Sequence, residues 1–138
     1  MKVFFSIFIL LFLSSTIYSA TPLAESPTST IEYASPKAAY EALSKKQDVT
    51  FRKEENGWVV AYDKSASTIW SFPPATDPSF PAVIKRTILE TAEGISIKMD
   101  VKCGASKEAC DQLVRNFSDL NEKIKQDIKQ KSESKNNL

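Results

Sequence analysis

The strongest constraint on the fold is a strict alternation of apolar and polar residues from Ile95 to Cys103. Every second residue is apolar, and the residues between them are serine, lysine or aspartate. Because successive side chains of a β-strand point to opposite faces of its sheet, this segment predicts a strand with one buried and one solvated face. Such a strand needs paired neighbours and a covering layer, and the rest of the chain must supply both.

Short segments rich in β-branched and aromatic residues, separated by turn-forming residues, precede this strand. They are typical of antiparallel strands that follow one another along the chain. The five expected strands are Val49–Lys53, Trp58–Asp63, Ser67–Phe72, Ala82–Glu90 and Ile95–Lys102. Since no helical pattern interrupts them, we expect a five-stranded antiparallel meander sheet.

The first hairpin carries the strongest turn signal in the chain. Asn56-Gly57 favours a two-residue type I′ turn, because both central positions of that turn need a positive φ. This turn sets Phe51 opposite Tyr62 in the sheet.

The last hairpin leaves two registers open. Gly94, as the third residue of a loop that starts at Ala92, favours a bulged turn that places Leu89 opposite Ile97. A two-residue loop would place Ile88 there instead, because a slip of one residue exchanges the two faces of a strand. Since Ile88 and Leu89 are both apolar, we expect a cover on the second face of the sheet as well.

Two helices are expected on the sheet. Ser35 followed by Pro36 is typical of an N-cap and first helical position, and this short helix should end near Lys46. Ser106 is suited to cap a longer helix, with Glu108 near its positive end. Apolar residues of that helix recur at helical spacing, namely Cys110, Leu113, Val114, Phe117, Leu120, Ile124 and Ile128. The sequence therefore predicts an α+β fold, with a short N-terminal helix and a long C-terminal helix packed on the sheet.

The start of the chain has the pattern of a cleavable secretory signal. A basic residue, an apolar run and small residues follow one another, and cleavage is expected after Ala20 or, alternatively, after Ser19. The apolar run is shorter than the roughly 20 residues that span a bilayer as a helix, so no stable membrane insertion is expected after cleavage. We therefore expect a periplasmic or secreted protein, divided into a signal peptide (1–20), a flexible leader (21–30), a single α+β domain (31–130) and a disordered tail (131–138).

The two cysteines, Cys103 and Cys110, are expected to form one disulfide. They lie in one short segment, and an exported chain meets an oxidising compartment. A redox-active or zinc-binding pair is the alternative, but the spacing is not Cys-x-x-Cys and the chain contains no histidine. The bridge is therefore interpreted as structural, tying the last strand to the first turn of the long helix.

Composition narrows the possible chemistry. Without histidine, the chain lacks the Ser-His and Cys-His nucleophile arrangements, and its three glycines fall at turns rather than in a phosphate-binding loop. Removing Lys2 with the signal leaves 17 basic and 17 acidic side chains, so no nucleic-acid partner is expected, and no cofactor or metal is expected either. Asp63, Asp77 and Asp100 have no spacing that pairs them, and a small carboxylate-dependent hydrolase is kept as an alternative.

Two segments are candidates for an interaction surface. The segment 70–81 holds four prolines and three large aromatic residues, and proline cannot donate to a β ladder, so most of it should be a loop. That loop either folds back so that Phe72 and Phe80 fill the uncovered face of the sheet, which is the preferred interpretation, or presents a rigid surface to a partner. The end of the long helix should project toward a partner helix or a second copy of the chain. The candidate residues on these two surfaces are Trp70, Phe72, Phe80, Ile124 and Ile128.

Several segments together resemble an uncharacterised group of small exported bacterial proteins. They are Asn56-Gly57-Trp58, Trp70-Ser71-Phe72-Pro73-Pro74, Pro81-Ala82-Val83-Ile84-Lys85-Arg86 and the pair Cys103 and Cys110. The similarity extends from Tyr33 to Asn121 and implies a bacterial envelope location, and no activity or site residue comes with it.

By elimination, the expected function is non-enzymatic binding of another envelope protein or a cell-wall component. One alternative is an inhibitor that inserts its disulfide-bounded loop into an envelope-directed enzyme. The carboxylate-dependent hydrolase is the other alternative.

Overall fold

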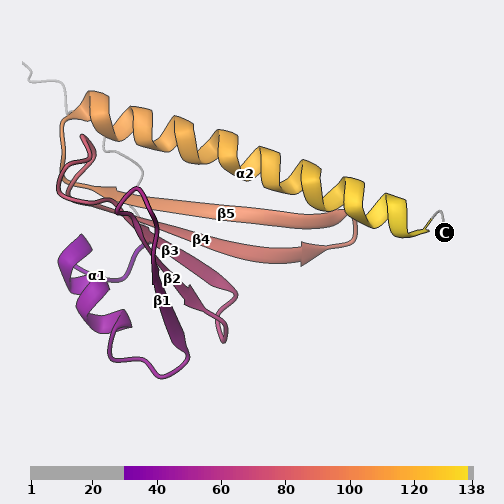
Figure 1. The fold of residues 1–138 in the computed structure, drawn as a ribbon, viewed down its shortest axis with the longest axis horizontal. Coiled ribbons are helices and arrows are strands. Elements are labelled where there is room, and N and C mark those ends of the chain that lie inside the picture. The colour runs from indigo at the N-terminus through magenta and orange to yellow at the C-terminus, as the bar shows by residue number, and fades with distance from the viewer. Residues whose placement is uncertain (1–29, 137–138) are drawn as a thin grey trace, which may run out of the picture.

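The computed structural model describes residues 30–136 and confirms the α+β fold (Figure 1). The five strands form one antiparallel meander in the order β1-β2-β3-β4-β5, as predicted. The expected signal peptide and residues 21–29 of the expected leader lie outside the described residues. The elements are α1 (Pro36–Leu43), β1 (Val49–Lys53), β2 (Val59–Asp63), β3 (Thr68–Phe72), β4 (Ala82–Thr91), β5 (Gly94–Cys103) and α2 (Lys107–Asn136).

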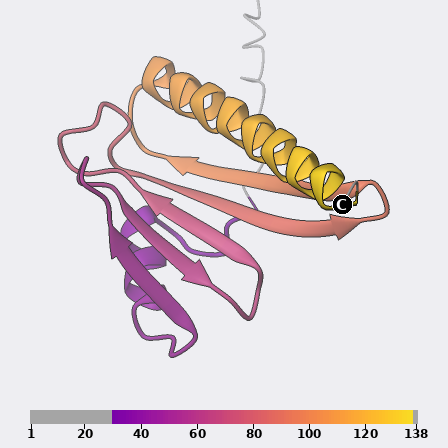
Figure 2. The same ribbon diagram turned by 45° about the vertical axis from the view of Figure 1, so that its right-hand side comes forward.

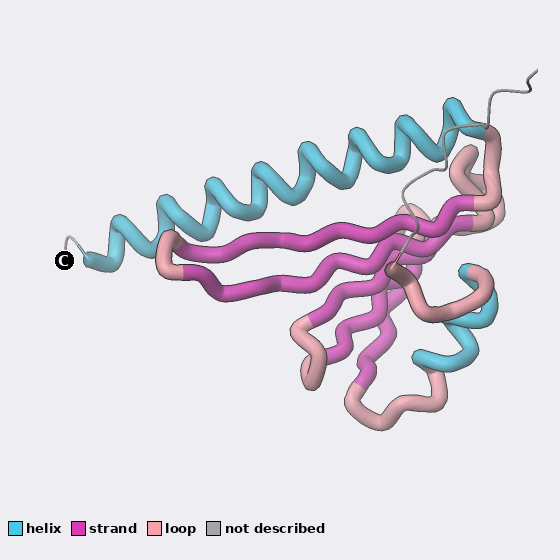
Figure 3. The backbone as a smooth tube through the Cα atoms, turned by 180° about the vertical axis from the view of Figure 1, so that it is seen from behind, coloured by secondary structure: helices cyan, strands magenta, loops and turns pink. Residues whose placement is uncertain are grey.

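The two helices lie on opposite faces of the twisted sheet (Figures 1 and 2). The core on the α1 side buries Ile31, Ala39, Leu43, Ala61, Trp70, Phe72 and Val83. The core on the α2 side is smaller and buries Ala82, Ile84 and Leu113. Because the neighbours Val83 and Ile84 enter different cores, β4 is buried on both faces, as its apolar residues predict. Figure 3 shows that α2 follows the long β4–β5 hairpin, while β1 to β3 turn away from it.

The first hairpin differs by one residue from the predicted register. Phe51 pairs with Ala61 and not with Tyr62. The turn is a three-residue loop closed by backbone hydrogen bonds, in which Gly57 has a φ of +85° and Asn56 does not have a positive φ. A type I′ turn needs positive φ at both positions, so the predicted turn is wrong.

The last hairpin adopts the second of the two registers considered. Ile88 pairs with Ile97 and Thr91 with Gly94, so the loop has two residues and the favoured bulged turn is wrong. This register turns Ile88 toward α2 and leaves Leu89 46 % exposed on the other face. Covering the face that carries Ile97 therefore outweighs the local preference of the turn.

The first residues of the two helices agree with the prediction better than their last residues do. Ser35 and Ser106 each accept a hydrogen bond from the backbone amide three residues further on, at 3.1 and 3.2 Å. α1 ends at Leu43, before the expected end near Lys46, although turn-like hydrogen bonds continue to Lys46.

α2 is longer than expected. It continues to Asn136, so residues 131–136 are helical and not part of a disordered tail, and residues 137 and 138 lie outside the described residues. An ion pair one turn apart on its surface, between Lys129 and Glu133 at 4.0 Å, supports these exposed turns. α2 follows the β4–β5 hairpin as far as its turn, where Ile128 lines a recess with Ile95, and only the C-terminal end of the helix projects beyond that turn (Figure 1).

The expected disulfide between Cys103 and Cys110 is present and joins the end of β5 to the first turn of α2. Cys103 packs against the α2-side core. Strand and helix are therefore fixed to each other at the end of the molecule where the segment after β3 also lies.

Candidate functional site

An apolar groove of about 520 Å³ lies between α1 and the segment that follows β3, and we call it the Phe80 groove. Lys37 and Glu41 of α1 stand at one side and form an ion pair with each other. The rest of the lining is dominated by rings and aliphatic side chains, namely Tyr40, Val59, Phe72, Pro73, Pro74, Phe80 and Pro81.

The floor of the Phe80 groove is an aromatic cluster between the sheet and α1. Phe72, at the end of β3, is only 7 % exposed. Its ring meets the Tyr40 ring edge-on at 5.4 Å between centroids, and Tyr40 meets Phe51 of β1 in the same way at 5.1 Å. Tyr40 nevertheless remains 42 % exposed and lines the groove.

Two consecutive turns hold the segment after β3 in a fixed shape. The amide of Asp77 donates to the carbonyl of Pro74, and the amide of Phe80 donates to the carbonyl of Asp77. The Asp77 carboxylate accepts hydrogen bonds from the amide and the hydroxyl of Ser79, at 2.9 and 2.6 Å. These contacts define the loop without help from a partner.

The same loop is anchored to the rest of the domain at both ends. The carbonyl of Pro81 accepts a hydrogen bond from the Gly104 amide at 2.8 Å, next to the disulfide. At the other end, Gly57 of the first hairpin lies so close to Pro74 that an added Cβ would be 3.3 Å from the proline ring. Phe80, joined to Pro81 by a cis peptide bond, stands between these anchors and remains 48 % exposed.

The three aromatic residues predicted for this segment have different positions. Trp70 is 2 % exposed and packs in the α1-side core against Tyr33, so it does not line the groove. Phe72 forms the floor of the groove, and only Phe80 is presented to solvent. The preferred interpretation, in which Phe72 and Phe80 cover the sheet, agrees with the burial of Phe72 but is wrong for Phe80, which is exposed as the alternative interpretation expects.

Tyr40 and Val59 complete the Phe80 groove, and no pattern in the sequence predicts this position for them. Tyr40 is outside the alanine- and leucine-rich stripe of α1 that packs on the sheet, and Val59 reads as an ordinary strand residue. Their role depends on the way α1 crosses the end of β3, which no local pattern encodes.

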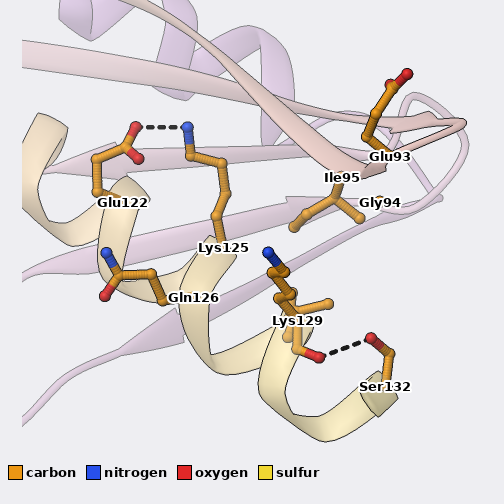
Figure 4. Close-up of a pocket in the computed structure, with 9 residues that line it drawn as sticks. Glu93, Gly94, Ile95, Glu122, Lys125, Gln126, Lys129 and Ser132 are labelled. Atoms are coloured by element: carbon orange, nitrogen blue, oxygen red, sulfur yellow. Dashed lines mark hydrogen bonds and ion pairs between the residues drawn. The ribbon is translucent and has the colours of Figure 1, made fainter. Parts of the chain in front are cut away.

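A second recess, of about 310 Å³, lies between the β4–β5 turn and the distal half of α2 (Figure 4). Ile128, which is 41 % exposed, lines it with Ile95, and Ile124 is half-buried outside its lining. In Figure 4 the Glu93 side chain points away, while Glu122 pairs with Lys125, so these two carboxylates do not converge.

The three aspartates considered as acid–base candidates have local partners. Asp63 accepts a hydrogen bond from Lys46 at 2.6 Å, and Asp77 holds Ser79 as described. Asp100 lies 4.0 Å from the ammonium of Lys98. Within residues 30–136, no group of three or more histidine, cysteine, aspartate or glutamate side chains is placed to hold a metal ion.

Comparisons with known proteins give no relative from which a role can be transferred. No protein-family model, curated protein or solved structure matches the chain. Among the described residues, neither helix combines the length and the apolar character that a membrane span requires.

Proposed function

We propose that this chain is an exported, non-enzymatic binding protein that holds an extended apolar segment of another envelope protein in the Phe80 groove. The observation that carries the proposal is the exposure of Phe80 and Tyr40, at 48 % and 42 %, on a loop and a helix that are otherwise fixed by hydrogen bonds and packing.

Rigid aromatic side chains bind at low entropic cost, because few rotatable bonds are frozen on association. Prolines in the groove wall remove backbone donors, so the wall offers a ligand mainly apolar contact. Aromatic grooves of this kind suit extended, proline-containing or aliphatic segments, whose own backbone is already extended. Such a segment is therefore the expected ligand.

The inhibitor alternative, in which the disulfide-bounded loop enters an enzyme, has less support than binding in the Phe80 groove. Its residues form the N-cap and first turn of α2, where Ser106 accepts a hydrogen bond from the Ala109 amide. Gly104 of the same ring donates to Pro81 and so supports the groove loop. The hydrolase alternative has no observation in its favour beyond the aspartates already described.

The exported location rests on the signal peptide expected at residues 1–20, on the oxidised cysteine pair and on the resemblance to small exported bacterial proteins. A disulfide in a small domain is typical of an oxidising compartment. The partner is accordingly expected among proteins that reach the same compartment.

The test is a selection of displayed random peptides against the purified mature chain, followed by fluorescence anisotropy with the enriched peptides. Phe80→Ala and Tyr40→Ala should each weaken binding about tenfold or more, which corresponds to about 1.4 kcal/mol. Leu89→Ala is the matched control, because Leu89 is 46 % exposed but lies away from the groove. Its affinity should equal that of the wild type.

Either of two results would overturn the proposal. One is that no peptide is enriched above an unrelated protein. The other is that enriched peptides lose affinity equally with Leu89→Ala and Phe80→Ala, since this would mean that the peptides adhere to exposed apolar residues in general.

A further inference from the structure

Arg86 of β4 is a buried cation with no acidic partner among residues 30–136. The residue is 8 % exposed, and its Nε is enclosed with no hydrogen-bond partner. Among the described residues, its guanidinium makes a single hydrogen bond, from Nη1 to the Asn121 side chain at 3.5 Å, the upper limit for such a contact. None of the ion pairs formed within residues 30–136 includes Arg86.

The groups that face Arg86 are neutral on every side. On α2, the Phe117 ring lies 5.2 Å from the guanidinium carbon, beside Asn121. Met99 is its partner on β5, and Ile69 is its partner on β3. Tyr62 follows Ile69 in the same row across the sheet.

A guanidinium in such surroundings is costly to the fold. Buried charges in proteins are normally paired, because water no longer solvates them and an unpaired ion must be stabilised by neutral neighbours alone. The ring of Phe117 and the amide of Asn121 offset part of this cost. Burial lowers the pKa of Arg86, and the Tyr62 phenol opposes that effect only in part.

Strand β4, which carries Arg86, borders strands β1 to β3 in the sheet. α2 follows the β4–β5 hairpin, and β1 to β3 turn away from it, so no described helix crosses the α2-side face of these three strands (Figure 2). Val60, Tyr62 and Ile69 are half-buried there without such a cover. Arg52, another cation near Tyr62, already pairs with Glu54 at 2.7 Å.

We propose that Arg86 is an anion-binding residue, which takes the carboxylate of an acidic side chain from a protein segment lying across the α2-side face of β1 to β3. A carboxylate matches the planar guanidinium and supplies the single negative charge that the cation lacks. The apolar surface of Val60 and Ile69 would cover the remainder of the segment. This site is independent of the Phe80 groove, which is built on the α1 side.

The proposal is tested by titrating the isotope-labelled mature chain with sodium acetate while sodium chloride keeps the ionic strength constant. The side-chain Nε–H resonance of Arg86 should shift and saturate, whereas that of Arg52 should not. Capped Leu-Glu-Leu should saturate the same resonance at a concentration at least tenfold lower than capped Leu-Gln-Leu. Inorganic phosphate should bind no more tightly than acetate.

Arg86→Met supplies the second arm. Because it removes an unpaired buried charge and keeps most of the side-chain volume, its melting temperature should equal or exceed that of the wild type. The peptide-induced shifts of the Ile69 and Tyr62 amides should weaken at least tenfold. A lower melting temperature, together with a wild-type Arg86 resonance that responds no differently to acetate than to chloride, would overturn the proposal in favour of a structural role. If the variant does not fold, the wild-type titration alone decides.

Discussion

Asp63, at the end of β2, is a buried carboxylate that organises the turn into β3. The residue is 3 % exposed, and its Oδ1 accepts hydrogen bonds from the Ser65 hydroxyl at 2.7 Å and the Ala66 amide at 3.2 Å. The hydrogen bond from the Lys46 ammonium lowers the pKa of Asp63 against the opposing effect of burial. The fold therefore stabilises the ionised form.

Asp63→Asn is expected to lower the free energy of unfolding at pH 7 by about 1–2 kcal/mol, because it removes the charge but keeps an oxygen for the turn. The half-exposed Lys46 limits the effect through solvent screening. A carboxylate whose pKa is lowered by folding stabilises the protein above its ordinary pKa of about 4, and this contribution is lost as the pH falls through the folded-state value. The difference between variant and wild type should therefore shrink at low pH.

Urea unfolding of both proteins at pH 7 and at pH 2.5 measures this difference. Asp77→Asn serves as a comparison, since Asp77 bonds only neutral donors of its own loop among the contacts described. A difference for Asp63→Asn that is equally large at both pH values would contradict the assignment to the Lys46 pair.

At the scale of elements, the positions of strands could be predicted but their registers could not. Val49–Lys53 is strand β1 as predicted, because the alternation and the turn residues around it are local signals. Asn56-Gly57 is compatible with two turns that differ in the conformation of Asn56, and the structure has the one that shifts Phe51. In the last hairpin, the cover provided by α2 decides the register, and that contact is distant in sequence.

The candidate site could be predicted only in part for the same reason. The sequence contains a segment rich in prolines and aromatic residues, and this segment predicts Phe80 as a candidate for the interaction surface. Tyr40 enters the groove through the packing of α1 on the sheet, and Arg86 becomes unusual only once Phe117 and Asn121 enclose it. Burial of a charge is a tertiary property that periodicity does not report.

The disulfide is the covalent link between two elements, β5 and α2. Replacing Cys103 and Cys110 with serine should lower the free energy of unfolding by about 2.5 kcal/mol, the value that chain entropy gives for a ring of this length. Urea unfolding of the variant and of the reduced wild type should give similar values, because both lack the same link. Peptide affinity of the Phe80 groove should persist well below the melting temperature, since its aromatic floor does not include the cysteines.

The outcome that would contradict this role is a variant with unchanged stability and lost peptide affinity. The ring would then contact the ligand itself, as the inhibitor alternative requires. Unchanged stability with unchanged affinity would instead mean that the Gly104 to Pro81 hydrogen bond holds this end of the molecule without the bridge.

At the scale of the whole molecule, the sheet separates two surfaces with different chemistry. The α1 side offers exposed rings and prolines around Phe80, whereas the α2 side offers an open sheet face beside the buried cation Arg86. Because the two are built on different cores, substitutions in one should change the free energy of unfolding independently of substitutions in the other.

The native protein is expected to begin at Thr21 and to carry the Cys103–Cys110 bridge. The basic, apolar and small-residue order of the first residues predicts processing by a signal peptidase, and a disulfide in a small domain is typical of an oxidising compartment. Intact-mass measurement of the protein from periplasmic and membrane fractions, before and after reduction, tests both features. The mass should lack residues 1–20 and should increase by two hydrogens on reduction. A mass that corresponds to a chain starting at Ala20 would place cleavage after Ser19. The mass of the full-length chain, recovered from the membrane fraction, would contradict processing and export as a free mature chain.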